Sequence, residues 1–308
     1  MGTTYSVVAR DTSRDLTRGD LQTAIDTALA QVNAQMSNWD ANSEISRFNA
    51  QGSTAPVQVS AELAEVMAAA DQVNGASLGR FDTTIGPLIE LWGFGATGQR
   101  ADAPAEAEIA AAAARAGHGN TLNIADGALQ KQQADAQVYL AAIGKGYGAD
   151  RVGKALESLG ITDYMIEIGG DLYASGRNPD GLPWQIGVET PESGARGLMD
   201  VVGVSNLGVA SSGDYRNYFE VDGQRFSHVL DPVTGRPITH RTASATVLAE
   251  NAMLADAWAT AMLTLGRARG LEVAQQHDIA VMFIDRVAGT SDLQFETVTS
   301  GAFDALRA

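Results

Sequence analysis

The sequence predicts an α+β fold in which mixed or antiparallel sheets pack against helices. Patterns typical of helices dominate the first half of the chain, and patterns typical of strands dominate the second half. The two types do not alternate regularly, as they would in a doubly wound parallel sheet. No internal repeat and no linker rich in Gly, Pro or Ser is present, so we expect residues 1–308 to form a single domain of two closely packed lobes.

The first half opens with a strand and continues mainly with helices. Apolar residues between positions 21 and 36 recur at helical spacing, and Ser60 is a suitable N-cap for a later helix. In order, the expected elements are a strand near 4–10, helices at 21–36, from 43, at 60–73 and at 101–116, strands near 121–124 and 136–141, and a helix from 144 to about 159.

The second half is expected to be mostly strands, interrupted by one strongly apolar helix. Asp222-Gly223 is typical of a tight hairpin turn. The expected strands cover about 164–168, 184–189, 200–204, 215–221, 225–230, 243–249, 280–285 and 294–299, and the helix covers 252–265.

Composition excludes several classes of function. The chain has 37 acidic and 21 basic residues, a formal net charge of −16. Such a surface repels nucleic-acid backbones, so no nucleic-acid partner is expected. The absence of cysteine excludes thiol catalysis, thiolate metal sites and disulfides. An anionic substrate would therefore need a local cation, either a metal ion or a well-placed Lys or Arg.

Asp256 and Thr260 form the most specific local feature. They stand four residues apart in the apolar helix, so both oxygens project from one helix face. A buried aspartate needs a partner or a metal, and a carboxylate with a hydroxyl suits Mg²⁺. The alternative is that Asp256 pairs with an arginine and Thr260 bonds back to its own helix, and spacing alone favours this alternative.

Gly144-Lys145-Gly146 opens a predicted helix and is a second candidate site. Small residues let a phosphate approach a helix N-terminus, and Lys145 supplies a positive charge. The Walker A pattern is absent, and an ordinary strand-to-helix turn explains the segment equally well.

Two polar segments, 211–218 and 227–237, lie among the predicted strands. His228 in the second segment has a side chain that can act as an acid or a base near neutral pH. The alternative is a strand histidine bonded to a backbone carbonyl. Ser211 and Ser212 lack the G-x-S-x-G context, which argues against a serine hydrolase.

Together these segments resemble the ApbE family, the FAD:protein FMN transferases. The resemblance is collinear over nearly the whole chain. It includes Met1–Tyr5, Met36–Trp39, Ser43–Asn49, Phe81–Leu88, Leu91–Gly95, Ile143–Tyr147, Gly169–Leu172, Ser211–Tyr218, Ser227–Pro232, Thr234–Pro237 and Ala255–Thr260.

The resemblance implies a flavin site between two lobes, with FAD as the substrate and Mg²⁺ as the cofactor. It places Mg²⁺ near Ala142, Asp256, Ala259 and Thr260. FAD-binding positions fall on Met1, Trp39, Arg80, Phe81, Asp82, Tyr139, Lys145, Ser212 and Leu230. The family usually has an aspartate where this chain has Tyr139, and some members have a second acidic residue at Ala259.

The chemistry implied is transfer of FMN from FAD to a Thr or Ser hydroxyl, with release of AMP. Lys145 would bind the diphosphate, and His228 or Asp231 would remove the hydroxyl proton. The target would be a flavoprotein subunit of a membrane redox complex, and the location periplasmic, after removal of a leader that preceded Met1. Two alternatives remain: a pyrophosphatase that cleaves FAD to FMN and AMP, and a non-catalytic flavin-binding assembly factor.

Overall fold

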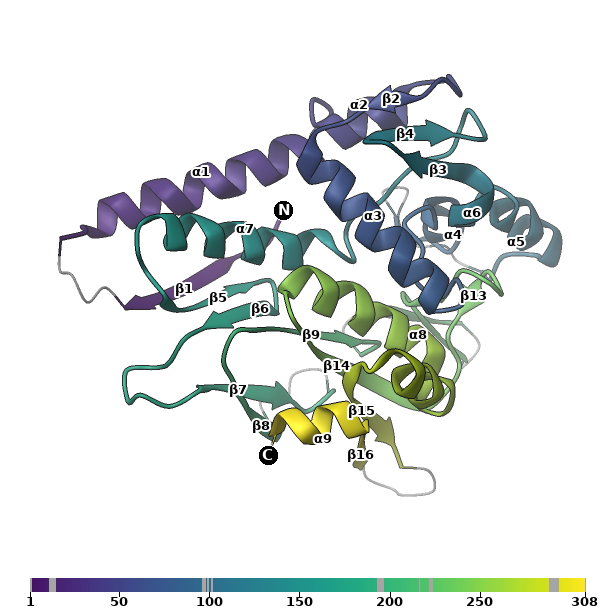
Figure 1. The fold of residues 1–308 in the computed structure, drawn as a ribbon. Helices are drawn as coiled ribbons and strands as arrows, with labels where there is room; N and C mark the ends of the chain where they lie inside the picture. Colours follow the sequence, from purple (N-terminus) through teal and green to yellow (C-terminus); the bar gives the residue numbers. More distant parts are fainter. Residues whose placement is uncertain are drawn as a thin grey trace.

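A seven-stranded antiparallel sheet forms the centre of the computed structural model, which describes residues 2–10, 15–95, 98, 100, 102–192, 197–215, 217–221, 224–287 and 294–307. The strand order is β1-β5-β6-β9-β14-β15-β16 (Figure 1). These strands are β1 (Tyr5–Arg10), β5 (Asp163–Ile168), β6 (Asp171–Ser175), β9 (Leu207–Gly213), β14 (Thr242–Ala249), β15 (Ala280–Arg286) and β16 (Phe295–Thr299). The predicted α+β class is confirmed.

Both faces of this sheet are covered at its inner strands, where successive side chains point to opposite faces and join different apolar clusters. On β14, Val247 belongs to the cluster beneath the helices, whereas Leu248 belongs to the cluster on the other face. Phe283 and Met282 divide in the same way on β15. The burial of both faces agrees with the burial of β14 over almost its whole length, from Thr242 to Leu248.

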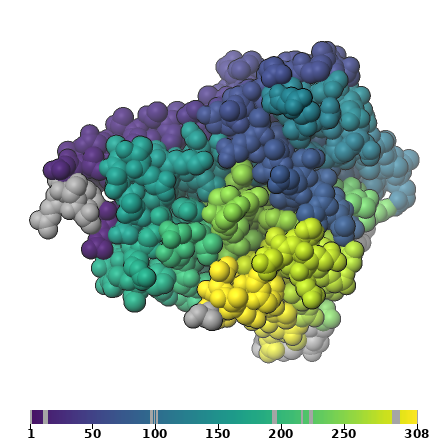
Figure 2. All heavy atoms as spheres, viewed as in Figure 1, coloured from purple at the N-terminus to yellow at the C-terminus, as the bar shows by residue number. Residues whose placement is uncertain are grey.

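Two helices, α7 (Gly144–Ser158) and α8 (Ala252–His277), cover one face, with α1 (Arg18–Met36) and α3 (Ala61–Ala76) packed beyond them (Figure 1). The space-filling view shows the face of the molecule on which α7 and α3 each pack against α8 (Figure 2). The opposite face carries the ribbon of β7 (Trp184–Glu189) and β8 (Leu198–Val204) together with α9 (Gly301–Arg307).

Smaller elements complete the fold beside α3. They are α2 (Glu44–Ala50), α4 (Gly86–Leu91), α5 (Glu106–Ala113) and α6 (His118–Thr121), the sheet β2 (Val57–Gln58), β4 (Ala128–Lys131) and β3 (Leu122–Ala125), and the ribbons β10 (Tyr218–Val221) with β11 (Gln224–Ser227) and β12 (Leu230–Asp231) with β13 (Arg236–Pro237). None of the described helices has the length and apolar character needed to cross a membrane.

Most predicted elements are present within a few residues of their expected bounds, but one prediction is wrong. The strand expected near 136–141 does not form, because side chains take the place of a neighbouring strand. Val138 and Leu140 donate their backbone N–H groups to the amide oxygens of Asn49 and Asn38, at 2.8 and 3.0 Å. The predicted Asp222-Gly223 turn lies outside the described residues, although β10 and β11 pair on either side of it.

Candidate functional site

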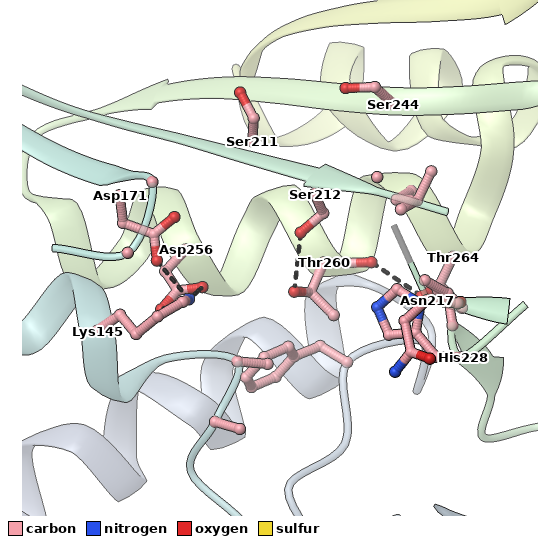
Figure 3. Close-up of a pocket in the computed structure, with 18 of the residues that line it drawn as sticks. Lys145, Asp171, Ser211, Ser212, Asn217, His228, Ser244, Asp256, Thr260 and Thr264 are labelled. Carbon is pink, nitrogen blue, oxygen red and sulfur yellow. Dashed lines mark hydrogen bonds and ion pairs between the residues drawn. The ribbon is translucent and has the colours of Figure 1, made fainter. Parts of the chain in front are cut away.

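A cavity of about 680 Å³ opens between the sheet, the N-terminal parts of α7 and α8, and the segment before α4. This volume is in the range usual for small-molecule and cofactor sites. Figure 3 shows a row of polar side chains along it, from Lys145, Asp171 and Asp256 at one end, through Ser212 and Thr260, to Asn217 and His228.

The start of α8 is fixed by its neighbours, and this places its functional face. Asn251 caps the helix by accepting the N–H of Leu254 at 2.8 Å. Asp150 of α7 accepts the N–H groups of Ala252 and Met253 at 2.8 and 2.9 Å. At Gly146, a Cβ would lie only 2.0 Å from the carbonyl oxygen of Ala252. Glycine therefore allows α7 to approach α8 closely beside Asp256.

Lys145 lies between two buried carboxylates. Its Nζ is 2.5 Å from Asp171 and 3.1 and 3.2 Å from the two oxygens of Asp256, and the backbone N–H of Gly146 donates to Asp256 at 3.2 Å. Burial alone would lower the pKa of Lys145, but the charges of Asp256 and Asp171 raise it overall. Burial, helped by the charge of Asp256, raises the pKa of Asp171. Asp256 thus pairs with a lysine, not with the arginine of the alternative interpretation.

Two hydroxyl groups follow along the cavity. The Oγ of Ser212 on β9 lies 3.2 Å from the Oγ1 of Thr260 on α8, so Thr260 is turned toward the sheet and not back onto its own helix. Thr264 makes the backward bond instead, donating to the carbonyl of Thr260 at 2.8 Å. The Asp256–Thr260 face predicted from spacing therefore does line the cavity.

These groups fit a magnesium ion. Mg²⁺ takes oxygen ligands and keeps several waters, so it needs few protein ligands. The described residues contain no cluster of three or more His, Asp or Glu side chains placed to bind a metal. They do offer the carboxylate of Asp256 and the hydroxyl of Thr260 on one cavity, which Ala142 also lines. No described backbone N–H donates to the carbonyl of Ala142.

His228 lies at the other end of the row. Its Nδ1 is 2.8 Å from the backbone carbonyl of Asn217, which can only accept, so Nδ1 carries the proton and Nε2 keeps its lone pair. Burial lowers the pKa of His228, and its hydrogen bond to Asn217 opposes this effect only in part. The two interpretations of His228 are therefore compatible. Its Nδ1 bonds a backbone carbonyl, and its Nε2 can still act as a base.

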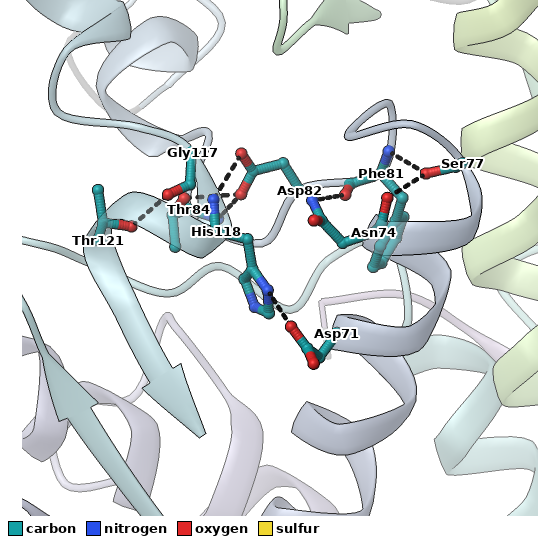
Figure 4. A network of polar contacts seen from close by, with 9 residues as sticks. All are labelled: Asp71, Asn74, Ser77, Phe81, Asp82, Thr84, Gly117, His118 and Thr121. Carbon is teal, nitrogen blue, oxygen red and sulfur yellow. Dashed lines mark hydrogen bonds and ion pairs between the residues drawn. The ribbon is translucent and has the colours of Figure 1, made fainter. Parts of the chain in front are cut away.

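The segment before α4 is held by a buried polar network (Figure 4). Asp82 accepts the N–H and the hydroxyl of Thr84, both at 2.7 Å, and the N–H of His118 at 3.3 Å. Asn74 of α3 donates to the backbone carbonyl of Phe81, and Ser77, the C-cap residue of α3, accepts the N–H of Phe81. This network fixes Arg80, Phe81 and Asp82 at the cavity wall.

Comparison with known proteins decides the family. Residues 1–283 match the sequence model of the ApbE family. The chain belongs to the ApbE family. It is 42% identical to a FAD:protein FMN transferase of Haemophilus influenzae over 312 aligned positions (99% of this chain and 89% of the relative). It is 40% identical to a FAD:protein FMN transferase of Vibrio cholerae over 303 positions (98% and 89%).

The fold agrees with this assignment. The structure of flavin transferase ApbE from Vibrio cholerae superposes with a TM-score of 0.89 at 39% sequence identity, covering 99% of this chain and 96% of that one.

Ten of the positions that the ApbE resemblance assigns to cofactor, metal or catalysis line the cavity. They are Arg80, Phe81, Asp82, Ala142, Lys145, Ser212, His228, Leu230, Asp256 and Thr260. They come from five separate stretches of sequence, which the fold brings together. Met1, also assigned to FAD, lies outside the described residues.

The structure does not bring four other predicted positions to the cavity lining. Trp39 is 83% exposed. The ring of Tyr139 packs against Gly86, where an added Cβ would lie only 2.0 Å from the ring atom Cε2. Asp231 forms an ion pair with Arg80. Ala259 is fully buried in the core, and its methyl group has no lone pair with which to bind a metal.

Asp171 also lines the cavity, but it was not predicted from the sequence. It stands in Gly169–Leu172, which supported the resemblance but was given no role. Gly169 and Gly170 have φ of +58° and +97°, and this turn sets Asp171 at the start of β6, facing Lys145. An acidic residue after two glycines was the available signal, but its partner lies 26 positions earlier in the chain.

Proposed function

We propose that this protein transfers the FMN part of FAD to a Thr or Ser hydroxyl of a target protein and releases AMP. Relatives named FAD:protein FMN transferase, at 40% and 42% identity over nearly the whole chain, support the reaction class. The observation that carries the proposal is the meeting of Lys145, Asp256 and Thr260 in one cavity of an otherwise acidic protein. That cavity offers binding groups for a diphosphate.

Magnesium would be held by Asp256, Thr260 and the carbonyl of Ala142. When bound, it would neutralise charge on the diphosphate of FAD and on the departing AMP. Ser212 would hold the Thr260 hydroxyl in position through their shared hydrogen bond.

The chain's own residues would bind the anion and move the proton. Lys145 would contribute its ammonium group to the diphosphate. The target hydroxyl would attack the FMN-side phosphorus, forming one P–O bond as the P–O bond to AMP breaks. Nε2 of His228 would accept the hydroxyl proton, and its lowered pKa would keep it neutral for that role at neutral pH. Asp231 is the less favoured base because its carboxylate is paired with Arg80.

The partner we propose is a flavoprotein subunit of a membrane redox complex, with the reaction taking place in the periplasm. This proposal follows from the resemblance to the ApbE family. An acidic protein is also poorly suited to a nucleic-acid partner.

The test mixes the purified protein with FAD, Mg²⁺ and a candidate target. Flavin fluorescence retained by the denatured target band, with AMP released in equal amount, is the expected result. Asp256→Ala should abolish transfer. Glu272→Ala changes an exposed carboxylate on the same helix and should leave transfer intact. Rapid AMP release without a target would favour the pyrophosphatase, and FAD that stays bound and intact would favour the assembly factor.

A further inference from the structure

Asp171, Lys145 and Asp256 form a cluster of two carboxylates around one ammonium group. Both carboxylates are buried, each with side-chain exposure of only 4%. Two buried carboxylates that share a single ammonium group repel each other, so the cluster favours a further positive charge, as a proton or as a metal ion.

The ammonium group of Lys145 contacts both carboxylate oxygens of Asp256, which are the atoms that a metal would need as ligands. Nζ is nearly equidistant from both oxygens of Asp256, and Gly146 N–H already donates to Oδ2. A cation bound to Asp256 would therefore meet the lysine at Oδ1. Two positive charges cannot share that oxygen without repulsion.

Asp171 offers Lys145 a second anchor that does not involve Asp256. Its contact with Nζ is the shortest of the cluster, at 2.5 Å. The lysine stem has room to lean toward Asp171 because residue 169 is a glycine, and a Cβ there would lie 3.3 Å from Lys145 Cδ. Glu167, another carboxylate of the cavity lining, accepts the N–H of Gly170 at 2.6 Å.

We infer that Lys145 is the resident counter-ion of Asp256, that an incoming divalent cation displaces it, and that Asp171 is the positioning residue that retains it at the cavity wall. The inference rests on the proposed function, since it concerns the same metal and diphosphate. Loading the metal then releases the lysine from Asp256, so one ammonium remains held by Asp171 and directed to the diphosphate. Metal and lysine become available to the substrate in one step.

The test measures Mn²⁺ binding without nucleotide, by electron paramagnetic resonance or calorimetry. The variant is Lys145→Met/Asp171→Asn, which removes one positive and one negative charge and so keeps the net charge. The matched control is Arg269→Met/Glu272→Gln, which does the same to an exposed pair on α8. If only the net charge of the protein mattered, the wild type, the variant and the control would bind Mn²⁺ with equal affinity.

Displacement predicts that the Lys145→Met/Asp171→Asn variant binds Mn²⁺ about tenfold more tightly than the wild type, because no ammonium competes for Asp256. The control should match the wild type. Equal or weaker binding by the variant, with binding still lost in Asp256→Asn, overturns the inference while the metal site stands. No binding in any of the proteins overturns the inference, whereas the proposed function is decided separately by the flavin-transfer assay. A clear difference in affinity without any flavin transfer would instead remove the proposed function and leave the inference intact.

A crystal structure of the wild type with Mn²⁺ and no nucleotide gives a second test that needs no variant. Lys145 Nζ should remain within hydrogen-bonding distance of Asp171 and lie beyond that distance from Asp256. An ammonium still bonded to both carboxylates, with the ion bound at Asp256, would refute the displacement.

Discussion

Ser212 on β9 and Thr260 on α8 meet across the cavity, with their hydroxyl oxygens 3.2 Å apart. This contact depends on how closely the strand approaches the helix. At Gly208, earlier in β9, a Cβ would lie 2.4 Å from the backbone nitrogen of Ala252. A glycine at this position lets β9 pass under the start of α8, which brings the two hydroxyl groups together.

Thr260→Val removes the hydroxyl and keeps the shape of the side chain. We expect the affinity for Mn²⁺ to fall by at least about tenfold, because one oxygen ligand is lost and Ser212 loses its partner. Calorimetry without nucleotide measures this directly. Thr260→Ser keeps the hydroxyl and should bind Mn²⁺ nearly as well as the wild type. Unchanged affinity in Thr260→Val would remove Thr260 from the metal site.

His228→Gln tests the proton transfer. The lowered pKa of His228 means that the neutral, basic form persists below the usual value of 6.5. In the wild type, the acid limb of the transfer rate should therefore have its midpoint below pH 6.5. The variant should transfer flavin about a hundredfold more slowly, and its pH profile should no longer show the acid limb. The measurement is the pH profile of flavin incorporation into the target at saturating FAD.

Asp231→Asn separates the two candidate bases. Because Asp231 is paired with Arg80 and not part of the cavity lining, its loss should leave the position of the acid limb unchanged, even if FAD binds more weakly. A limb that disappears in Asp231→Asn and persists in His228→Gln would reverse the assignment.

Local patterns in the sequence were enough to predict much of this fold. The apolar helix predicted to end at Leu265 does leave helical geometry at the next residue, where Gly266 has φ of +69°, although helical turns resume and run to His277. The Asp256–Thr260 spacing likewise placed both side chains on one cavity. In both cases the information lies within a few neighbouring residues.

Long-range partners could not be predicted in the same way. The segment near 136–141 has the composition of a strand, but Asn38 and Asn49 supply its hydrogen bonds from about 90 to 100 positions away. Asp171 and Asp256 reach Lys145 from 26 and 111 positions away. Such pairings depend on the topology of the sheet, which no local pattern contains.

Gly146→Ala should destabilise the protein by about 1–3 kcal/mol, because a methyl group would meet the backbone carbonyl of Ala252, which cannot rotate away. Chemical denaturation measures the loss. Gly75→Ala is the matched control, since Gly75 is also helical but has nothing within 4 Å of its Cβ position. That change should be neutral or stabilise the fold by about 0.5–1 kcal/mol. Equal effects of the two substitutions would contradict the close packing of α7 on α8.

Asp150→Asn should change how stability depends on pH. Burial raises the pKa of Asp150 to about 7 from its ordinary 3.8, despite the two N–H groups of α8 that favour its charged form. Between these values the folded protein binds a proton that the unfolded chain does not, so this group makes the free energy of unfolding fall as the pH rises toward 7. The asparagine variant has no such proton. Relative to the wild type it should gain on the order of 2–3 kcal/mol between pH 5 and pH 8, measured by denaturant unfolding at each pH. A constant difference between the two proteins across that range would show that Asp150 is already charged in the folded state at pH 5.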